Sequence, residues 1–498
     1  MKNIIIYSLL IITICGGSYL KFHKNHENIP IGCDEFGYMN LAKAIHHNKE
    51  FKDHVSRPYL IDLIKILRDS GYSEQEIDWL LVPHSYYVAP HSYQIFNQYA
   101  PGTSYILSVF PVDSMKLYFT PIAILLLLVI PLITLFKVTK TAWGWPQIIL
   151  FIFTVFITLT SVFLVELTRI NSLAFTFGLL LSAGIMLKHN SLISCLLIAI
   201  SANFRIVNLL LLLPLIAFIN LPITITLSNI INWIKTGFKY LLITLFALSP
   251  YLIYVYRLKG NPFLNTYSSI DTTSTFDFGS NMKFYFNLNS EFFIYHLILI
   301  GILLYLLMSK KINTKTFLAV LLFPLLNYTF FITHKMQINY YPYGSIFIVF
   351  GFLLSSINKS IKPYKAQIII AILALFVLID GILKFKNQTH ETIITAKQSY
   401  KELNNFNIVW GDLIPSASDF VWENSAFKFA ASTPRCRKTV INYLYSKGYS
   451  QIFLINDIPL KPYEITAELS ELNLPFKPFV TQKLGTAFIL LPKKNNEK

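Results

Sequence analysis

Long apolar runs separated by short polar segments dominate the chain. The runs lie at 3–20, 118–136, 145–165, 171–187, 191–204, 206–220, 240–256, 292–309, 316–333, 343–357 and 366–384. A helix of about 20 apolar residues crosses the hydrocarbon core of a bilayer, and several of these runs are shorter than that. No Ala-x-Ala cleavage site follows the first run, so we expect it to be retained as a helix. The pattern predicts an α-helical polytopic membrane protein with about eleven transmembrane helices.

The composition agrees with a membrane protein. Of the 498 residues, 54% are hydrophobic and 14% are charged, whereas about 25% of residues are charged in soluble proteins. The formal net charge is +16, and a nucleic-acid-binding protein would gather such charge on a soluble face. Here the basic residues stand between apolar runs. We therefore expect no nucleic-acid partner and interpret the charge as setting the membrane topology.

The charges are unequally divided between the two sides of the predicted membrane domain. If the N-terminus is cytoplasmic, the inner loops contain no Asp or Glu, and their lysines are Lys137, Lys140, Lys188, Lys235, Lys239, Lys310, Lys311, Lys315, Lys359, Lys362 and Lys365. Cytoplasmic loops of membrane proteins are enriched in Lys and Arg. We therefore expect a transmembrane domain at 1–384 and an extracytoplasmic region at 385–498. Richness in Lys, Asn and Ile is typical of an AT-rich bacterial genome, which favours a bacterial inner membrane.

Three exterior regions follow from this topology, at 21–117, 257–291 and 385–498. The first is a large loop in which the apolar positions of 59–68 fall on one face of a helix, with these charged residues off that face: Asp62, Lys65 and Arg68. Such a helix lies in the membrane interface or forms the core of a small extracytoplasmic domain. Both alternatives stay open.

The C-terminal region alternates helical and strand-like patterns. Helices are predicted at 390–405 and 437–448, and strands at 407–410, 451–455 and 486–491. The region contains no P-loop, no GxGxxG sequence and no metal motif. We expect a small extracytoplasmic α/β domain without a nucleotide site.

Two adjacent carboxylates, Asp34 and Glu35, follow the first apolar run at the start of a short amphipathic helix. Asp can cap a helix by accepting from its first N–H groups, and Glu suits the positive end of the helix dipole. A structural role is therefore open for both, and so is a chemical role at the outer membrane surface. A third acid, Glu166, stands at the outer end of the third run, where it takes part in chemistry or pairs with Arg169.

Several short motifs follow one another on the exterior side. After Asp34-Glu35 come Asn97-Gln98-Tyr99-Ala100-Pro101-Gly102-Thr103, Arg205 between two short runs, Asn261-Pro262-Phe263, and His334-Lys335-Met336-Gln337-Ile338-Asn339-Tyr340-Tyr341-Pro342. In order and sidedness they resemble the GT-C class of polyprenyl-phosphate-dependent glycosyltransferases, above all its protein O-mannosyltransferase and lipid A aminoarabinose transferase branch. Ala100 stands where many members carry proline, so the subfamily and the sugar stay open.

The resemblance implies a GT-C-like fold and an enzyme that moves a sugar from a polyprenyl-phosphate donor to a lipid, glycan or protein acceptor outside the cytoplasm. Transfer with inversion needs a carboxylate to take the acceptor proton, and cations or donors to hold the leaving phosphate. By position the resemblance points to Asp34 as the catalytic base, with Glu35 and Glu166 as further catalytic candidates. Alternatively, Glu35 only shapes the loop.

Exterior and boundary residues are candidates for binding the donor phosphate. Arg can bind phosphate through two parallel hydrogen bonds, while Lys offers a point charge. The substrate-binding candidates are Arg57, Arg169, Arg205, Arg257, His334, Lys335 and Tyr340. Among them Arg205 and Lys335 come first, because both the predicted topology and the resemblance select them.

A metal site is not favoured by the spacing of the potential ligands. The histidines of the first loop, His46, His47, His84 and His91, form no ligand set with carboxylates. We therefore expect no cofactor, and a divalent metal stays an alternative. Of the four cysteines, Cys33 and Cys436 can meet outside the membrane, but none of the four has metal-ligand spacing.

Other classes of protein remain as alternatives. A transporter or flippase of a lipid-linked or polar substrate would place ionisable residues near mid-membrane and often contains inverted repeats. Asp380 is the one acid well inside an apolar run, it lies near the outer end, and we find no repeat. A scaffold with a C-terminal binding module and a glycan polymerase or ligase are also open. The large, acid-bearing first loop favours the glycosyltransferase.

Overall fold

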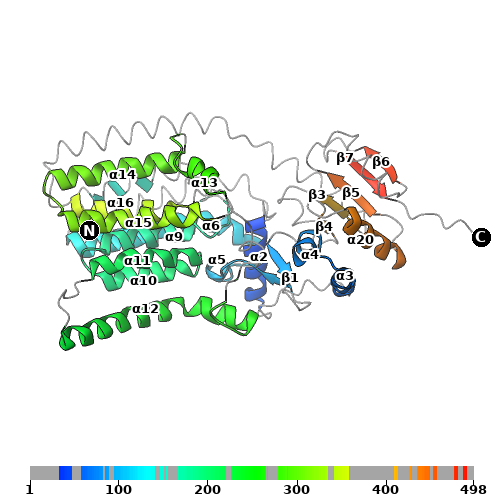
Figure 1. Ribbon diagram of the computed structural model, residues 1–498, viewed down its shortest axis with the longest axis horizontal. Coiled ribbons are helices and arrows are strands. Elements are labelled where there is room, and N and C mark those ends of the chain that lie inside the picture. The colour runs from blue at the N-terminus through cyan, green and yellow to red at the C-terminus, as the bar shows by residue number, and fades with distance from the viewer. Residues whose placement is uncertain are drawn as a thin grey trace, which may run out of the picture.

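The computed structural model describes residues 33–47, 58–81, 85–88, 95–140, 146–147, 149–150, 153–154, 167, 169–219, 226–264, 266, 277–288, 290–334, 341–357, 409–412, 426–428, 434–448, 452–456, 476–480 and 486–490. The helices expected at 3–20, 366–384 and 390–405, and most of 145–165, lie outside these residues. The described chain forms a bundle of apolar helices, short elements at one end of the bundle, and a five-stranded sheet beyond them (Figure 1).

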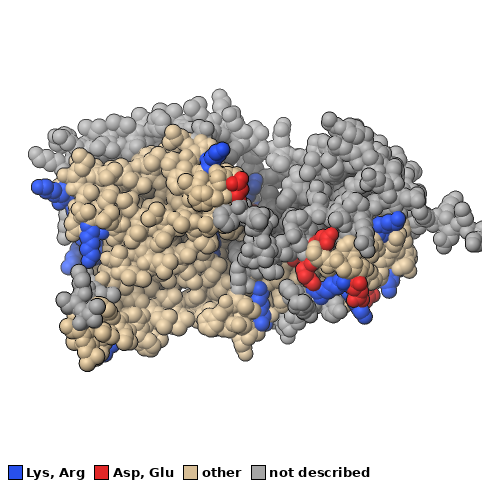
Figure 2. All heavy atoms as spheres, in the orientation of Figure 1, with Lys and Arg blue, Asp and Glu red and all other residues tan. Residues whose placement is uncertain are grey.

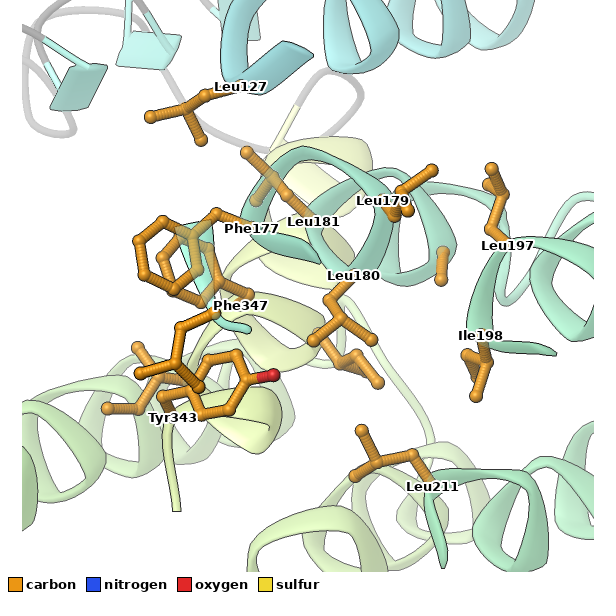
Figure 3. Close-up of a cluster of buried hydrophobic side chains, with 14 of the residues drawn as sticks. Leu127, Phe177, Leu179, Leu180, Leu181, Leu197, Ile198, Leu211, Tyr343 and Phe347 are labelled. Atoms are coloured by element: carbon orange, nitrogen blue, oxygen red, sulfur yellow. The ribbon is translucent and has the colours of Figure 1, made fainter. Parts of the chain in front are cut away.

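Helix α9 (Ala174–Met186) forms the centre of the bundle, with all its side chains buried. It packs against α6 (Met115–Thr139) on one side and α16 (Tyr343–Ile357) on another. Figure 3 shows the resulting core, in which side chains of the three helices meet: Leu127, Phe177, Leu180, Leu181, Tyr343 and Phe347. The predicted runs 118–136, 171–187 and 343–357 therefore correspond to packed helices.

Glycines let the backbones of these helices approach one another closely. A Cβ atom on Gly178 would lie 2.2 Å from the backbone oxygen of Leu126 in α6, and one on Gly351 would lie 2.0 Å from that of Leu181. Lipid tails are as apolar as leucine, so helices in a membrane associate largely through such close van der Waals packing. Replacing either glycine would force the two backbones apart.

The other apolar helices surround this core. They are α10 (Ser191–Ala202), η2 (Ile206–Leu211), α11 (Leu212–Leu215), η3 (Ile216–Phe218), α12 (Leu227–Lys259), α14 (Glu291–Met308) and α15 (Thr314–Ile332). In the part of the chain that the structure describes, three helices are long and apolar enough to cross a membrane, at Val112–Thr139, Leu227–Lys259 and Thr314–Ile332, and five more are apolar but shorter. The expected total of about eleven stays a prediction.

Helix α12 is longer than its hydropathy indicates. The apolar run at 240–256 marks only its second half, yet the helix begins at Leu227, where Thr226 caps it by accepting from the backbone N–H of Asn229 at 3.2 Å. Polar residues in the first half lower the mean hydropathy below that of a span. Its apolar residues still recur every three or four positions, which is the spacing of a helix. The segment thought to be a loop is thus a helix.

The described lysines of the predicted inner loops share one end of the bundle. Helix α6 starts beside the first loop and reaches Lys137 and Lys140 at its other end, and Lys188 directly follows α9. Figure 2 shows Lys and Arg at this end and a broad surface with little charge beside it. The opposite end, where the first loop lies, is called the site end below.

The first loop contributes seven short elements at and beyond the site end. They are α2 (Cys33–His46), α3 (Pro58–Asp69), α4 (Glu74–Leu81), β1 (Tyr86–Val88), β2 (Ile95–Asn97), α5 (Gly102–Leu107) and η1 (Val112–Ser114). Strands β1 and β2 pair antiparallel, with Tyr86 opposite Asn97. The residues Tyr99 to Thr103, called the Tyr99–Thr103 motif below, are the end of the longer motif that begins at Asn97. They follow the hairpin and run into the first turn of α5, so the hairpin places this motif beside the bundle.

The amphipathic helix of the first loop, α3, buries its apolar face within the protein. Its apolar residues Leu63, Ile64 and Leu67 are buried, and it contacts α4 and α20 (Pro434–Ser446). Tyr443 Oη donates to Asp62 Oδ2 at 2.9 Å across this contact. This arrangement corresponds to the core-helix alternative for 59–68, and it joins the first loop to the C-terminal region.

The C-terminal sheet has the strand order β4-β3-β5-β7-β6. Its strands are β3 (Val409–Asp412), β4 (Ala426–Lys428), β5 (Ile452–Asn456), β6 (Phe476–Val480) and β7 (Thr486–Leu490). Strand β3 pairs in parallel with β4 and β5, whereas β7 pairs antiparallel with β5 and β6. Three of these strands occur near predicted positions, while β4 and β6 do not stand out in the sequence.

Candidate functional site

Asp34 lies in the first turn of α2, partly exposed at the site end. Tyr99 Oη donates to Asp34 Oδ1 at 2.7 Å. The Tyr99 ring stacks on Tyr38, with ring centroids 4.8 Å apart, and lies directly over Gly37, where a Cβ atom would come within 2.5 Å of it. The structure therefore brings the acidic pair and the Tyr99–Thr103 motif together, although 65 positions separate the two bonded residues.

Glu35 is only 1% exposed, and its carboxylate has two partners inside the protein. Lys116 Nζ, also buried, donates to Glu35 Oε2 at 2.9 Å, and the backbone N–H of Ile170 donates to Oε1 at 3.0 Å. These contacts hold the start of α2 against α6 and against the segment that leads into α9. The geometry supports the loop-shaping role of Glu35 rather than contact with a substrate.

The segment from Asn97 to Ser104 connects three parts of the site end. The side-chain amide of Asn97 donates to the backbone oxygen of Gly37 at 2.8 Å, and Ser104 Oγ donates to that of Tyr38 at 2.9 Å. Further along, Thr103 Oγ1 donates to the backbone oxygen of Asn171 at 2.9 Å. These bonds hold α2 against the segment that leads into α9. Each of them needs a side chain that can donate a hydrogen bond, which Asn97, Thr103 and Ser104 provide.

Gly102 makes the third connection, to the end of α10. Its N–H donates to the backbone oxygen of Asn203 at 2.8 Å, and a Cβ atom on Gly102 would lie 2.7 Å from that oxygen. The side chain of Asn203 bonds to the backbone of α12 on both sides of Pro250: its amide donates to Ala247 O at 2.8 Å, and its oxygen accepts from Tyr251 N at 3.0 Å. Pro250 lies inside α12, and proline disturbs the helix ladder at such a position. Asn203 therefore ties the motif to α12.

Arg205 follows this junction as the N-cap residue of η2 and is partly exposed. Its guanidinium carbon lies 4.6 Å from the centroid of the Tyr341 ring, within the range of a cation–π contact. The His334 and Tyr341 ring centroids are 5.5 Å apart. Two of the predicted phosphate-binding residues, Arg205 and His334, thus share one tyrosine at the site end.

The C-terminal turn of α12 adds two cations to the same end. Arg257 is exposed, and its charge partly offsets the burial that raises the pKa of Tyr105 in α5. Lys259 Nζ lies 5.0 Å from the ring centroid of Tyr87 in β1. Burial raises the pKa of Tyr87, and the charge of Asp78 adds to this effect. The turn therefore anchors α12 to the first loop.

The remaining predicted residues are placed less closely or lie outside the described residues. Arg169 is exposed beside the segment that binds Glu35. Arg57, Glu166, Lys335 and Tyr340, and the side chains of Cys33 and Cys436, are outside what the structure describes. Within the described ranges, no group of three or more His, Cys, Asp or Glu side chains could hold a metal ion.

Sequence reasoning missed four residues that organise the site: Tyr99, Lys116, Asn203 and Tyr341. Tyr99 and Tyr341 stand inside motifs that the sequence singled out, so their position carried a signal. Lys116 was hidden at the start of an apolar run, where a lysine usually reaches toward the membrane surface. Asn203 stands between two apolar runs, and its function depends on Pro250, 47 positions later in the sequence, which no local pattern reveals.

The sequence matches neither a known protein-family model nor a curated protein. The structure is similar to that of ArnT from Cupriavidus metallidurans bound to undecaprenyl phosphate, with 9% identity, 97% of this chain and 98% of that chain covered, and a TM-score of 0.54. The apo state of the same protein gives 10% identity, 97% coverage of both chains and a TM-score of 0.54.

An oligosaccharyltransferase from Archaeoglobus fulgidus is similar at 11% identity, with 98% of this chain and 74% of that chain covered; its TM-score of 0.45 is too low to carry an argument. The likeness to ArnT shows that the chain has the GT-C membrane fold that the order of motifs predicted. With its apolar helices, this makes it an integral membrane protein.

Proposed function

We propose that this protein is a membrane glycosyltransferase that moves a sugar from a polyprenyl-phosphate donor to a hydroxyl of a lipid, glycan or protein. The observation that carries the proposal is the contact between Asp34 and Tyr99, which presents a carboxylate at the same end of the bundle as Arg205 and His334. The structure of ArnT bound to undecaprenyl phosphate supports a donor of this lipid class.

In the proposed reaction, the acceptor hydroxyl attacks the anomeric carbon of the sugar while the bond from that carbon to the phosphate oxygen breaks. Asp34 takes the hydroxyl proton as the new bond forms, which requires an ionised carboxylate within hydrogen-bond reach. An ionised carboxylate offers about four acceptor positions on two oxygens. Asp34 can therefore accept from Tyr99 and from an acceptor hydroxyl together, and Tyr99 orients it. A single displacement inverts the anomeric configuration.

The electron pair of the broken bond stays on the phosphate, whose negative charge therefore increases as the donor departs. Cations positioned beside the developing charge lower the barrier. Arg205 is the first candidate, because its guanidinium lies on Tyr341 in a partly exposed position. His334 lies against the same ring, and Lys335, the next residue in the chain, is the second candidate.

We also propose the sidedness of the reaction. The lysines of the predicted inner loops that the structure describes, among them Lys137, Lys140 and Lys188, lie at the end opposite Asp34, and positive loops face the cytoplasm. The site would then lie on the extracytoplasmic side, with the N-terminus inside and the C-terminal sheet outside. A polyprenyl-phosphate sugar on the outer surface of a bacterial inner membrane would reach such a site by lateral diffusion.

The test is a transfer assay with a polyprenyl-phosphate sugar in membranes that contain equal amounts of each variant. Asp34→Asn retains the shape of the side chain and can still cap α2, so the protein should fold, whereas loss of the base should lower the rate about 10²–10⁴-fold. Asp69→Asn, which changes an exposed acid at the end of α3, is the matched control and should leave the rate unchanged. Full activity of Asp34→Asn would overturn the assignment.

A further inference from the structure

Helix α13 (Phe278–Tyr285) lies at the site end, just before α14. It begins at Asp277, whose side chain accepts from the backbone N–H of Ser280 at 3.1 Å. Its inner face is formed by Asn281 and Tyr285, both buried. Figure 1 shows α13 next to the beginning of α14, away from the end of the bundle that carries the lysines of the predicted inner loops.

Asn281 fixes the depth of α13 relative to the bundle. Its side-chain amide donates to the backbone oxygen of Ile332 at 2.7 Å and to that of His334 at 2.8 Å. Ile332 is the last residue of α15, and the final carbonyls of a helix have no partner inside the helix. Helix α13 therefore lies across the end of α15, which is long and apolar enough to cross a membrane.

One side of α13, next to its buried face, is apolar and exposed. Phe278 is 57% exposed and Met282 37%. Phe286, which follows the helix, is 40% exposed on one side, while its ring also stacks on Tyr328 of α15, with ring centroids 5.2 Å apart. Residues spaced by four positions lie above one another on a helix, so the three side chains form one stripe. Exposed Lys283 stands next to this stripe. A stripe of large apolar side chains with a flanking lysine is typical of helices that lie in a membrane interface.

The neighbouring surfaces indicate what covers this stripe. Ile294 and Leu297 near the start of α14 and Phe330 near the end of α15 are exposed large hydrophobic residues on helices of membrane-spanning character. The stripe is at the level of these helix ends, so the same lipid that contacts α14 and α15 reaches it. Lys283 can extend its ammonium toward lipid phosphates while its methylene groups stay on the apolar side.

We infer that α13 lies in the membrane interface at the site end and inserts Phe278, Met282 and Phe286 into the lipid leaflet there. The partner is the bilayer itself, at the boundary between headgroups and acyl chains. Because Asn281 of α13 binds the backbone of His334, the depth of α13 in the lipid also sets the depth of this candidate phosphate-binding residue. This inference concerns membrane contact and does not depend on the proposed reaction.

Spin labels on the full-length protein in lipid nanodiscs test the inference. The four native cysteines are replaced by serine, and single cysteines are introduced by Phe278→Cys, Met282→Cys and Phe286→Cys. Accessibility to oxygen, which partitions into lipid, is compared with accessibility to a water-soluble nickel chelate. Leu325, exposed in the middle of α15, is the lipid reference, and Ser70, exposed after α3, is the aqueous reference.

We expect oxygen accessibility at the three positions to resemble that at Leu325, with low accessibility to the nickel chelate. Nickel accessibility equal to that at Ser70 would place the stripe in water and overturn the inference. Low accessibility to both reagents would also overturn it, because a protein surface or a second copy of the chain would then cover the stripe. If the cysteine-free protein does not fold, photolabelling of the unmodified protein by a lipid-borne diazirine should modify residues 278–288, and absence of label there would refute it.

Discussion

The buried pair of Glu35 and Lys116 should be the most sensitive polar contact of the site end. Lys116→Met keeps the approximate length of the side chain but removes the cation from the buried Glu35 carboxylate, which keeps the backbone N–H of Ile170. At the observed separation of 2.9 Å, the Coulomb attraction is about 6 kcal/mol for an effective dielectric constant of about 20. Much of this is offset by the loss of hydration, yet breaking a buried pair by removing one partner typically costs about 3–5 kcal/mol.

A double-mutant cycle separates the contact from the effect of each side chain. We expect Glu35→Met and Lys116→Met each to lower stability by about 3–5 kcal/mol, because each leaves a buried charge without its partner. The double variant Glu35→Met with Lys116→Met should lose less than the sum, since no charge is then buried. It should not recover fully, because the N–H of Ile170 loses its acceptor, at a cost of about 1–3 kcal/mol.

The assay is the unfolding of the purified protein in detergent, followed by its denaturation midpoint and by its transfer activity. Lys137→Met, at the exposed far end of the same helix, is the matched control and should shift the midpoint little. Additive effects of the two single substitutions would refute the pairing. Unchanged stability of both single variants would refute the claim that Glu35 shapes the site.

Two further predictions concern the tyrosines of the site. Gly37→Ala should displace the Tyr99 ring, which is nearly buried and cannot move freely. The substitution should therefore lower stability by about 1–3 kcal/mol and also lower transfer activity. Gly237→Ala, where a Cβ atom meets nothing within 4 Å, is the control, and equal behaviour of the two variants would contradict the prediction. Arg205→Gln should lower both kcat and kcat/KM for the donor, because the guanidinium stabilises the charge that develops on the departing phosphate. Tyr341→Leu should have the same effect more weakly, since it removes only the support of the guanidinium. Steady-state kinetics with the donor varied checks both, and an unchanged kcat/KM for the donor in Arg205→Gln would move the phosphate site elsewhere.

The membrane character of the chain is evident from its sequence, because it depends on local composition alone. A run of apolar residues becomes a helix wherever lipid surrounds it, since every backbone N–H and C=O group must then be bonded within the segment. The runs at 292–309, 316–333 and 343–357 accordingly match α14, α15 and α16 within a few residues. The start of α12 at Leu227 was not predicted from the apolar runs, because the first half of this helix combines helical periodicity with several polar residues.

The choice of Asp34 as the candidate base stays a prediction, which came from its place after the first run and from the resemblance to the GT-C class. The same resemblance selected the motif that contains Tyr99 and Thr103. The sequence could not assign the partners of these residues. Asp34 and Glu35 are adjacent residues with the same functional group. Whether each carboxylate is bonded inside the protein or stays accessible to a substrate depends on segments far away in the chain.

The tertiary structure supplies the partners of both carboxylates. It brings α6 and the segment before α9 to Glu35, across 81 and 135 positions of sequence, and it brings Tyr99 to Asp34. It likewise placed Tyr341 against Arg205, although Tyr340 was the residue selected from the sequence. Local patterns thus determine which segments form helices, while long-range packing determines which partners neighbouring side chains such as Asp34 and Glu35 meet.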